Sequence, residues 1–500
     1  MTKLRTLAPA LVLLALAALA APVHALTWTC STVVKKKATD PLSGIFGSRF
    51  DQPAINGAGD VTFHAKVKNG GRRLYLYPGA GAPVVVATAG DPAPGGSTFR
   101  KFVRPSINDA GEVGFLGDLA TGEAVFVREA GGTIVNAAMT GDASPGGGTF
   151  AKIVVVSYIA ADGDVAFIAR VSGGPDGVFL YDKGTDTVST VALVGDLTGD
   201  GRVFCDFLRD CAVGLSDLGH AAFQATTAVD CLAGPVIGGV WQDLLGFTKV
   251  ADVGDGTPIG GTTYQRFVGA PLANASDKVL FRAKLKPADT CNNPTANVCT
   301  MDADCAATCV GGGNAGEACT LLTDCPDQGP GTACVPGICG GDRCLGGPQI
   351  GKPCSGAGDC GGNACDVPGQ RGQALFLFDP AGPSTVKVAA EGDAAAGTTG
   401  FLKTLAQPGG LSNGDQAGFR SKVKQSSASQ GVFVYDGVDE PIVLRTQGVP
   451  TDQFGFATSY RKIFEDTGLD RSGTQATHSA KVKDTNSPPS NAGLFRCTGA

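Results

Sequence analysis

The side chains that most often carry out catalysis are scarce and scattered in this sequence. Its 500 residues include four histidines. His24 lies in the leader described below, and His64, His220 and His478 lie in strand-like segments of different repeats. No Gly-x-Ser-x-Gly, His-Glu-x-x-His or P-loop pattern accompanies them. We therefore interpret the three later histidines as surface or strand-face residues, and the sequence favours a protein that is not an enzyme and has no cofactor.

One segment has the spacing of oxygen ligands found in calcium loops. Asp196, Thr198 and Asp200 stand at its first, third and fifth positions, followed by Gly201 at the sixth. Position twelve is Phe207, where a calcium loop uses a bidentate Glu. The segment is therefore a weak calcium candidate, and the sequence offers no other metal site.

Asp196 also belongs to a Gly-Asp turn motif that recurs along the chain, as in the segment 90–96, Gly-Asp-Pro-Ala-Pro-Gly-Gly. In a closed ring the aligned aspartates would share one face and could form an acidic rim for cations or basic partners. We favour the alternative that each aspartate caps its own turn. The aligned aspartates are Asp40, Asp91, Asp142, Asp196, Asp255 and Asp393.

A second motif sets the length of a repeat. The segment 56–63, Asn-Gly-Ala-Gly-Asp-Val-Thr-Phe, matches 108–115, Asn-Asp-Ala-Gly-Glu-Val-Gly-Phe. We expect each Asn to accept a hydrogen bond from a backbone amide two residues on, and each Gly to adopt positive φ where the chain enters the next strand. The residues concerned are Asn56, Gly59, Asn108 and Gly111. Looser copies place the Asn-equivalent position at 56, 108, 160, 216, 274, 412 and 470.

Each copy spans roughly 50 to 60 residues and contains four strand-like runs, apart from an insertion of about 80 residues in the fifth copy. In the first copy, Val61, Phe63, Ala65 and Val67 alternate with polar residues, as expected of a strand with one buried face. Four-stranded units of this length are typical of β-propeller blades. An open β-solenoid is the main alternative.

The two chain ends distinguish these folds. Cys30 and Cys497 fall where a turn would lie if the seventh repeat continued into the first. A disulfide would hold their Cα atoms within about 7 Å of each other, which an open solenoid cannot do. We therefore predict an all-β protein, a seven-bladed β-propeller of four-stranded blades closed by both termini.

The N-terminal segment has the features of an export signal. Lys3 and Arg5 precede an apolar run at 7–20, and Val-His-Ala at 23–25 is a small-x-small cleavage pattern. We assign 1–25 to a signal peptide and expect a secreted or periplasmic protein after cleavage near Ala25. No later segment is long and apolar enough to span a membrane, and the net charge of −6 argues against a nucleic-acid partner.

Three further regions follow the signal peptide. We assign 26–290 to blades one to five, 291–369 to a disulfide-rich insertion in blade five, and 370–500 to the end of blade five and blades six and seven. Twelve of the 17 cysteines lie between Cys291 and Cys365. Their Cys-x5-Cys spacing and the absence of His favour disulfides over zinc, although the sequence does not give their connectivity.

The three remaining cysteines, Cys205, Cys211 and Cys231, lie in blade four. If the second and third strands pair about the turn at 216–219, Cys205 falls opposite residue 230. We therefore expect a Cys205–Cys231 disulfide, which leaves Cys211 as the odd thiol and as a buried small hydrophobe.

The Asn-x-x-Gly-x-x-Ala-Phe pattern, joined to the Gly-Asp turn, resembles the family of bacterial exported proteins with tandem NxxGxxAF repeats. This resemblance implies export and a repeat fold, and it supplies no catalytic residues. The insertion resembles small Dickkopf-type or EB-type modules in its Cys spacing and in the Asp before Cys. Several copies depart from the pattern: Ala160, Ser216, Ser412 and Asp470 replace Asn, and Asp277 and Asp415 replace Gly.

The sequence favours a non-catalytic exported scaffold that binds an extracellular protein or glycan through loops on a rigid frame. The insertion is its most distinctive surface and the expected partner contact. Two alternatives stay open. One is a polysaccharide-active enzyme on a propeller frame, whose carboxylates would converge in the central channel. The other is a structural surface or matrix protein.

Overall fold

The computed structural model describes most of the chain after residue 27. The predicted signal peptide, Cys211 and all of the insertion except six short strands lie outside the described residues. The described residues contain no helix, and therefore none that could cross a membrane. They are 28–208, 213–244, 246–259, 262–287, 290–291, 308–310, 333–335, 339–340, 342–343, 353–354, 372–424, 426–437, 442–446, 458–484 and 491–499.

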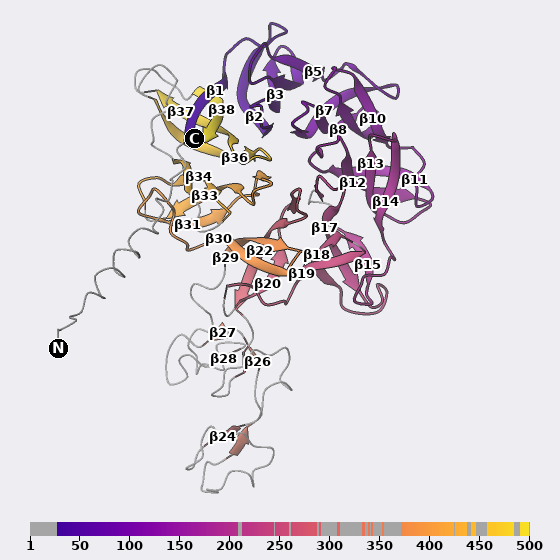
Figure 1. Ribbon diagram of the computed structural model, residues 1–500, viewed down its shortest axis with the longest axis vertical. Helices are drawn as coiled ribbons and strands as arrows, with labels where there is room; N and C mark the ends of the chain where they lie inside the picture. The colour runs from indigo at the N-terminus through magenta and orange to yellow at the C-terminus, as the bar shows by residue number, and fades with distance from the viewer. Residues whose placement is uncertain are drawn as a thin grey trace, which may run out of the picture.

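Seven small antiparallel sheets stand around a central axis and form a ring (Figure 1). Each sheet is one blade, and its strands run from an inner strand at the axis to an outer strand at the rim. Blade one comprises β2 (Ile45–Ile55), β3 (Val61–Lys68), β4 (Gly71–Tyr77) and β5 (Val84–Thr88). Blade two comprises β7 (Ser97–Ile107), β8 (Val113–Leu119), β9 (Gly122–Arg128) and β10 (Ile134–Met139), with the short β6 (Pro92–Ala93) before it. Blade three comprises β11 (Thr149–Val156), β12 (Val165–Ser172), β13 (Gly177–Asp182) and β14 (Thr187–Leu193).

The inner strand is interrupted in blades four, five and six. Blade four comprises β15 (Val203–Phe207), β16 (Gly214–Leu215), β17 (Ala221–Ala228), β18 (Ile237–Asp243) and β19 (Phe247–Asp252). Blade five comprises β20 (Thr262–Phe267), β21 (Leu272–Ala273), β22 (Val279–Pro287), β29 (Gly372–Asp379) and β30 (Ser384–Ala390). Blade six comprises β31 (Phe401–Leu405), β32 (Gly410–Leu411), β33 (Ala417–Lys424), β34 (Gln430–Tyr435) and β35 (Ile442–Thr446).

The insertion leaves blade five between β22 and β29. Its described strands are β23 (Thr290–Cys291), β24 (Thr308–Val310), β25 (Ala333–Val335), β26 (Cys339–Gly340), β27 (Asp342–Arg343) and β28 (Pro353–Cys354). They form three two-stranded ladders, β23 with β26, β24 with β25 and β27 with β28.

Blade seven is built from both ends of the chain, as the sequence predicted. It comprises β36 (Thr458–Leu469), β37 (Gln475–Asp484), β38 (Asn491–Gly499) and β1 (Trp28–Lys35). Cys30 lies opposite Cys497 in the antiparallel β1–β38 pair, and the two form a disulfide across a sequence separation of 467 residues. This closure confirms the seven-bladed propeller and excludes the solenoid. The disulfide lies inside the strand pair rather than at a turn, because both terminal strands continue past the predicted turn position.

Each blade has a pair of large side chains facing each other across its second and third strands. The register partners are Phe63–Tyr75, Phe115–Phe126, Phe167–Phe179, Phe223–Trp241, Phe281–Phe376, Phe419–Phe433 and His478–Phe495. In blade seven, His478 takes the place of the repeated Phe. It is fully buried, and its ring stacks on Phe495 with centroids 5.2 Å apart. Burial of an aromatic pair contributes to each blade's core. Of the two expected places, the surface or a strand face, His478 therefore occupies a strand face that packs in the core.

His64 also lies on a buried strand face, in β3, whereas His220 is only partly buried. In blade seven the Asn-type turn is one residue longer. The repeat pattern counted from Asp470 therefore does not place His478 at the position of the repeated Phe. Asp470 N donates to Gln475 O in blade seven, whereas Asn56 N donates to Asp60 O in blade one.

The Asn turns join each inner strand to the second strand of the same blade, and together they form one face of the ring. We call this face, formed by the turns 56–60, 108–112, 160–164, 216–220, 274–278, 412–416 and 470–475, the Asn face. Gly59 and Gly111 both have φ of 79°, as predicted, and Asp277 and Asp415 take the same role at 58° and 65°. Asn and Asp tolerate this left-handed region better than most residues.

Asn274 Oδ1 accepts from Ser276 N, two residues on, as predicted, whereas the side-chain hydrogen bonds of Asn56 and Asn108 differ from the prediction. Asn56 Oδ1 accepts from Asp60 N at 2.8 Å and Asn108 Oδ1 accepts from Glu112 N at 2.9 Å, four residues on rather than two. The backbone oxygen of Asn56 also accepts from Gly59 N. This bond bends the chain into a turn, and the amide of the fourth residue then comes within reach of the side-chain oxygen.

The Asn amides also join neighbouring blades. Asn56 Nδ2 donates to Asn108 O at 3.1 Å, and Asn108 Nδ2 donates to Ala160 O at 3.0 Å. Asn274 Nδ2 donates in the same way to Ser412 O at 3.0 Å. All of these positions are buried. The motif therefore fixes the contact between successive blades as well as the hairpin within a blade.

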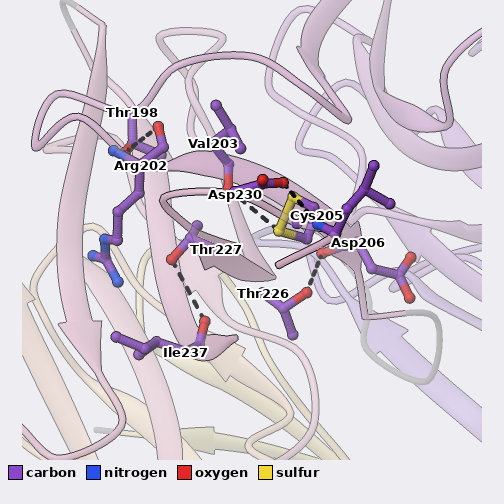
Figure 2. Close-up of a disulfide and its surroundings, with 11 residues drawn as sticks. Thr198, Arg202, Val203, Cys205, Asp206, Thr226, Thr227, Asp230 and Ile237 are labelled. Carbon is purple, nitrogen blue, oxygen red and sulfur yellow. Dashed lines mark hydrogen bonds between the residues drawn. A yellow bond between two sulfur atoms is a disulfide. The ribbon is translucent and has the colours of Figure 1, made fainter. Parts of the chain in front are cut away.

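The second predicted disulfide, Cys205–Cys231, is present in blade four (Figure 2). The strand register around it differs from the sequence estimate. Phe204 pairs with Thr227 and Asp206 with Thr226, so that Cys205 lies at a bulge rather than opposite residue 230. The loop 229–236 after β17 brings Cys231 back to the bulge, with 5.4 Å between the two Cα atoms.

Candidate functional site

The central channel contains a cavity of about 500 Å³. Its walls come from the inner strands of blades one, two, three, five, six and seven, from the second strands of blades five and six, and from the start of β29, the third strand of blade five. Residues 209–212 of blade four lie outside the described residues. Cavities of this size are typical of small-molecule sites in propellers and barrels.

Six cationic side chains line this cavity, and none of the described lining residues is Asp or Glu. Five of the six come from blades five and six. The chain as a whole carries a net charge of −6, so the cavity has the opposite sign to the molecule. The six cations are Arg104, Arg266, Arg282, Lys284, Arg420 and Lys422.

Two of these arginines are held in place by the protein. Arg282 Nη1 donates to Leu405 O at 2.5 Å, which also joins blade five to blade six. Arg420 is buried, and its Nη2 donates to Gln430 Oε1 at 3.0 Å. Arg266 and Lys422, in contrast, are exposed. The cavity therefore combines fixed charges in its wall with accessible charges towards its opening.

A backbone distortion occurs at two of the lining residues, Gln52 and the cation Arg104. Gln52 and Arg104 have φ of 50° and 51°, and both lie at register shifts in the inner strands of blades one and two. Gln52 Oε1 accepts from Arg104 N at 2.7 Å. Such bulges re-aim side chains and are common beside functional sites.

One acidic group lies close to the cationic walls without lining the cavity. Burial raises the pKa of Glu391, and the backbone of Gln373 and the charges of Lys284 and Lys403 partly offset this effect. The charge of Lys284 therefore also acts on a carboxyl group that lies beside the cavity rather than in its wall.

The channel narrows towards the Asn face. A second, smaller cavity of about 50 Å³ lies there, with Ile55, Ile107 and Leu469 among its lining residues. Arg471 of blade seven crosses this end of the channel. Its Nη2 donates to Ile159 O of blade three at 3.2 Å, and its Nη1 lies 2.7 Å from Asp217 Oδ1 of blade four. The channel is therefore obstructed at the Asn face.

The opposite face is where the inner strands begin, and we call it the Gly-Asp face, formed by the turns 38–44, 89–96, 140–148, 194–202, 253–259 and 391–400. It also carries the connections between second and third strands. The two long ones are the insertion of blade five and the loop 229–236 of blade four, which the Cys205–Cys231 disulfide anchors (Figure 2). Val229 and Leu232 of that loop are 83% and 97% exposed. The open end of the channel thus lies on the face from which the two longest connections leave the ring.

The aspartates of the Gly-Asp turns mostly cap their own turns, as favoured from the sequence. In five of them Oδ2 accepts from a backbone amide three residues earlier: Thr88 N to Asp91, Met139 N to Asp142, Leu193 N to Asp196, Asp252 N to Asp255 and Ala390 N to Asp393. The alignment of Asp40 with them was wrong. Phe46 N donates to Ala38 O as Phe99 N donates to Asp91 O, so Ala38 is the equivalent residue. Asp40 is buried and pairs with Arg73 and Tyr75.

The candidate calcium residues have other partners in the structure. Asp196 caps its turn, and Thr198 Oγ1 donates to Asp200 Oδ1 at 2.6 Å. Arg202 Nη2 lies 2.6 Å from Asp200 Oδ2, and its hydrogen bond lowers the pKa of Asp200 to about 2. No group of three or more His, Cys, Asp or Glu side chains placed to hold a metal occurs within the described ranges. A cation at Asp200 would have to displace the guanidinium of Arg202.

Sequence reasoning missed the cationic cavity, although a signal for it was present. The segments 281–284 and 419–422 read Phe-Arg-Ala-Lys and Phe-Arg-Ser-Lys. In each, the Phe and the small residue face the core, and period-two alternation turns Arg and Lys to the opposite face. A basic pair after the repeated Phe in two adjacent blades therefore indicates a charged wall between them.

The fold and this cavity define the protein as a seven-bladed β-propeller with a cationic central channel. The family described as "Family of unknown function (DUF7453)" matches residues 28–125 and 119–318. The chain therefore belongs to this family. No curated protein matches the sequence.

Several solved structures resemble the chain at low identity. Apo prolyl oligopeptidase B from Galerina marginata is 10% identical with a TM-score of 0.39, over 89% of this chain and 51% of that one. Dipeptidyl peptidase 4 from Porphyromonas gingivalis is 11% identical with a TM-score of 0.36, over 91% and 61%. The polysaccharide lyase Uly1 is 8% identical with a TM-score of 0.34, over 92% and 91%. The chain spans about half the length of the prolyl oligopeptidase, and the identification rests on the family match and on the ring of blades.

Proposed function

We propose that this protein is a non-catalytic, extracellular binding scaffold that takes its ligand into the central channel from the Gly-Asp face. The observation that carries the proposal is the channel itself, a cavity of about 500 Å³ obstructed at one end by Arg471. Strands from six blades supply its walls. A ligand held there would contact a rigid frame, which limits the entropy lost on binding.

The chemistry of the walls supports binding in preference to hydrolysis. Among the described lining residues none is Asp, Glu, His or Cys, which are frequent general acids, bases and nucleophiles. Ser157, Tyr158 and Lys284 do line the cavity, but the described lining residues offer them no carboxylate or imidazole. Glycoside hydrolysis in most enzymes uses two carboxylates. A purely structural matrix role, the other alternative, does not account for an open cavity with six charged side chains.

Export is part of the proposal. The two disulfides of the described residues, Cys30–Cys497 and Cys205–Cys231, suit an oxidising compartment. The segment 1–25 and the resemblance to exported NxxGxxAF-repeat proteins support the same compartment. The insertion leaves the ring between the end of β22 and the start of β29, on the Gly-Asp face, and we propose that it adds a second contact to a macromolecular ligand.

A variant that fills the channel tests the proposal. Thr404 lines the cavity and is only half-buried, so Thr404→Trp obstructs the cavity with little disturbance of the core. Thr187→Trp on the exposed rim of blade three is the matched control. We expect the wild type and the control to bind components of a glycan and small-acid array, and Thr404→Trp to lose this binding with an unchanged circular dichroism spectrum. Unchanged binding by Thr404→Trp, or release of new reducing or unsaturated ends from a bound glycan, would contradict the proposal.

A further inference from the structure

We infer that blade four carries a second binding surface on the Gly-Asp face, which binds a polypeptide segment whose apolar side chains are flanked by Lys and Arg. Its residues are not among those that line the channel cavity, so the inference goes beyond the proposed function. Of the eleven large apolar side chains that are exposed in the described residues, five stand at this edge of blade four, with exposures from 37% at Val253 to 97% at Leu232. We call these five the blade-four patch: Leu197, Val229, Leu232, Val236 and Val253.

The strand pairing brings the segments of the patch into one row across the end of the blade. Leu197 pairs with Val203 at the start of β15, and Val203 pairs with Ala228 at the end of β17. Val253 N, just after β19, donates to Gly238 O near the start of β18 at 2.8 Å. Neighbouring strands lie about 4.8 Å apart, so the row spans roughly 20 Å. Five exposed apolar side chains along this row form one surface, whereas exposed apolar residues that are scattered singly need no explanation.

The most exposed part of the patch is held in place by the protein itself. Three of the five side chains belong to the loop 229–236, and Cys231 within this loop forms the disulfide with Cys205 of β15 (Figure 2). Asp230 Oδ1 accepts from Leu232 N at 2.8 Å, which fixes the backbone beside the exposed leucine. A loop that is already ordered loses little conformational entropy when it binds, and this favours a role in recognition.

The charge of the surrounding segments selects the partner. The three segments that carry the patch contain five aspartates against two cations, a net charge of −3. Arg202 and Lys249 are the two cations, and both form ion pairs with aspartates of the same segments. A partner with basic residues beside its apolar ones complements such a surface. The segments are 194–202, 229–236 and 249–256.

The same charge disfavours two other occupants of the patch. In a symmetric dimer the patch would face its own copy, and the two acidic surfaces would repel each other. A membrane surface that is rich in anionic lipids would repel the patch as well. A basic polypeptide segment with apolar side chains is the occupant that fits both the apolar row and its charge.

Fluorescence anisotropy with three labelled dodecapeptides tests the inference. Their sequences alternate Leu with Lys, Leu with Glu, and Ser with Lys. We expect the Leu-Lys peptide to bind at least tenfold more tightly than the other two, with affinity falling as salt rises. Equal binding of the Leu-Glu peptide would mean that charge does not select the partner, and equal binding of the Ser-Lys peptide would mean that apolar contact does not. Either result, or no binding of the Leu-Lys peptide, would overturn the inference.

A loop variant places the binding on the patch. Val229 and Leu232 are largely exposed, so Val229→Ser with Leu232→Ser removes apolar surface with little effect on folding. We expect at least a tenfold loss of affinity for the Leu-Lys peptide, because burial of each side chain contributes to binding. Leu42→Ser with Leu218→Ser, two exposed leucines outside the patch, is the control and changes affinity less than twofold. An unchanged affinity in the loop variant would overturn the inference.

Sedimentation velocity and vesicle flotation test the two other occupants. If the wild type forms a dimer that the loop variant dissociates, the patch is an interface between copies of this chain. If phosphatidylglycerol vesicles bind the wild type but not the loop variant, the patch is a membrane contact. Either outcome would overturn the inference. Equal sedimentation of the two proteins, with no difference in vesicle binding, supports it.

Thr404→Trp, which obstructs the channel, separates this inference from the proposed function. We expect this variant to bind the Leu-Lys peptide as the wild type does. If Thr404→Trp abolishes this binding and the loop variant keeps it, the peptide enters the channel, and the inference fails while the proposed function stands. If Thr404→Trp keeps both the peptide and the ligands of the glycan and small-acid array, the proposed function fails while the inference stands.

Discussion

Arg471 of blade seven forms an ion pair with Asp217 of blade four, with 2.7 Å between Nη1 and Oδ1, although the two blades stand across the ring from each other. Both side chains are largely buried, at 16% and 13% exposure. Asp217 Oδ1 also accepts from Ala161 N of blade three at 3.0 Å. One side chain therefore ties the terminally closed blade to two blades on the far side of the channel.

Removing Arg471 should weaken the ring. Arg471→Ala leaves the carboxylate of Asp217 partly buried with its backbone partner alone, and we expect a loss of about 2 kcal/mol in the free energy of unfolding. Asp217→Asn removes the charge on the other side. Urea denaturation of the two single variants and the double variant gives the coupling between them. Effects that simply add would show that the pair does not couple the blades.

The two disulfides should differ in their contribution to stability. In the chain-entropy model, a cross-link over a longer loop removes more freedom from the unfolded chain. Cys30–Cys497 closes 467 residues and Cys205–Cys231 closes 26. We expect replacement of Cys30 and Cys497 by Ser to cost about 5 kcal/mol, and replacement of Cys205 and Cys231 by Ser to cost about 3 kcal/mol.

Reversible urea unfolding of both serine pairs, with intact mass checked under non-reducing conditions, measures this order. A larger loss for the pair in blade four would mean that the termini remain paired without their disulfide. The β1–β38 ladder pairs the chain from Trp28 with Gly499 to Lys35 with Gly493, so such an outcome would assign the closure to the pairing of these two strands.

The Asn amide at the blade junction can be tested at Asn108. Its Nδ2 donates to Ala160 O of the next blade, and its Oδ1 accepts from Glu112 N. Asn108→Ala leaves both backbone groups buried without this partner, and we expect a loss of about 2 kcal/mol. Asn108→Ser, which copies the residue at 216 and 412, should cost less because Ser216 Oγ accepts from His220 N at 3.2 Å and Ser412 Oγ accepts from Gln416 N at 3.0 Å. Equal losses in the two variants, measured by thermal unfolding, would exclude a role for the local hydrogen bond.

His64 should make the protein less stable in mild acid. Burial lowers the pKa of His64 to about 4, and this outweighs the raising effect of Asp51, while Arg72 and Arg49 lower it further. The unfolded chain takes up a proton near its ordinary value of 6.5, whereas the folded protein does not until about pH 4. Stability contributed by the neutral ring is therefore present above pH 6.5 and is lost as the pH falls towards 4, by about 3 kcal/mol in total.

His64→Gln is the variant that isolates this effect. Asp243 acts in the opposite direction, because burial raises its pKa to about 6 and the folded protein then binds its proton before the unfolded chain does. The difference in unfolding free energy between wild type and His64→Gln, measured from pH 4 to pH 7, removes the contribution of Asp243. A difference that does not change with pH would mean that His64 is accessible to protons in the folded state.

The sequence by itself determined the number of blades, their strands and the way that the ring closes. These follow from local rules: period-two alternation around Phe63, positive φ at Gly59 and Gly111, and the places of Cys30 and Cys497 in the repeat. Such features depend on neighbours a few residues away or on the repeat count, and both can be read from one chain. The register at Cys205 and the role of His478 could not be read from the sequence. A bulge at Cys205 and a turn one residue longer before His478 shift the alignment, and neither has a clear mark in the sequence.

Only the tertiary structure brings the residues of the candidate functional site together. Arg104, Arg282 and Arg420 come from three blades and are up to about 300 residues apart in sequence, and they line one cavity only because the ring gathers the inner strand of blade two and the second strands of blades five and six around one axis. In the same way, nothing local to Arg471 indicates that it reaches Asp217. Charge convergence and cross-channel contacts depend on the closed arrangement of all seven blades, whereas each blade's own fold depends on little beyond its own repeat.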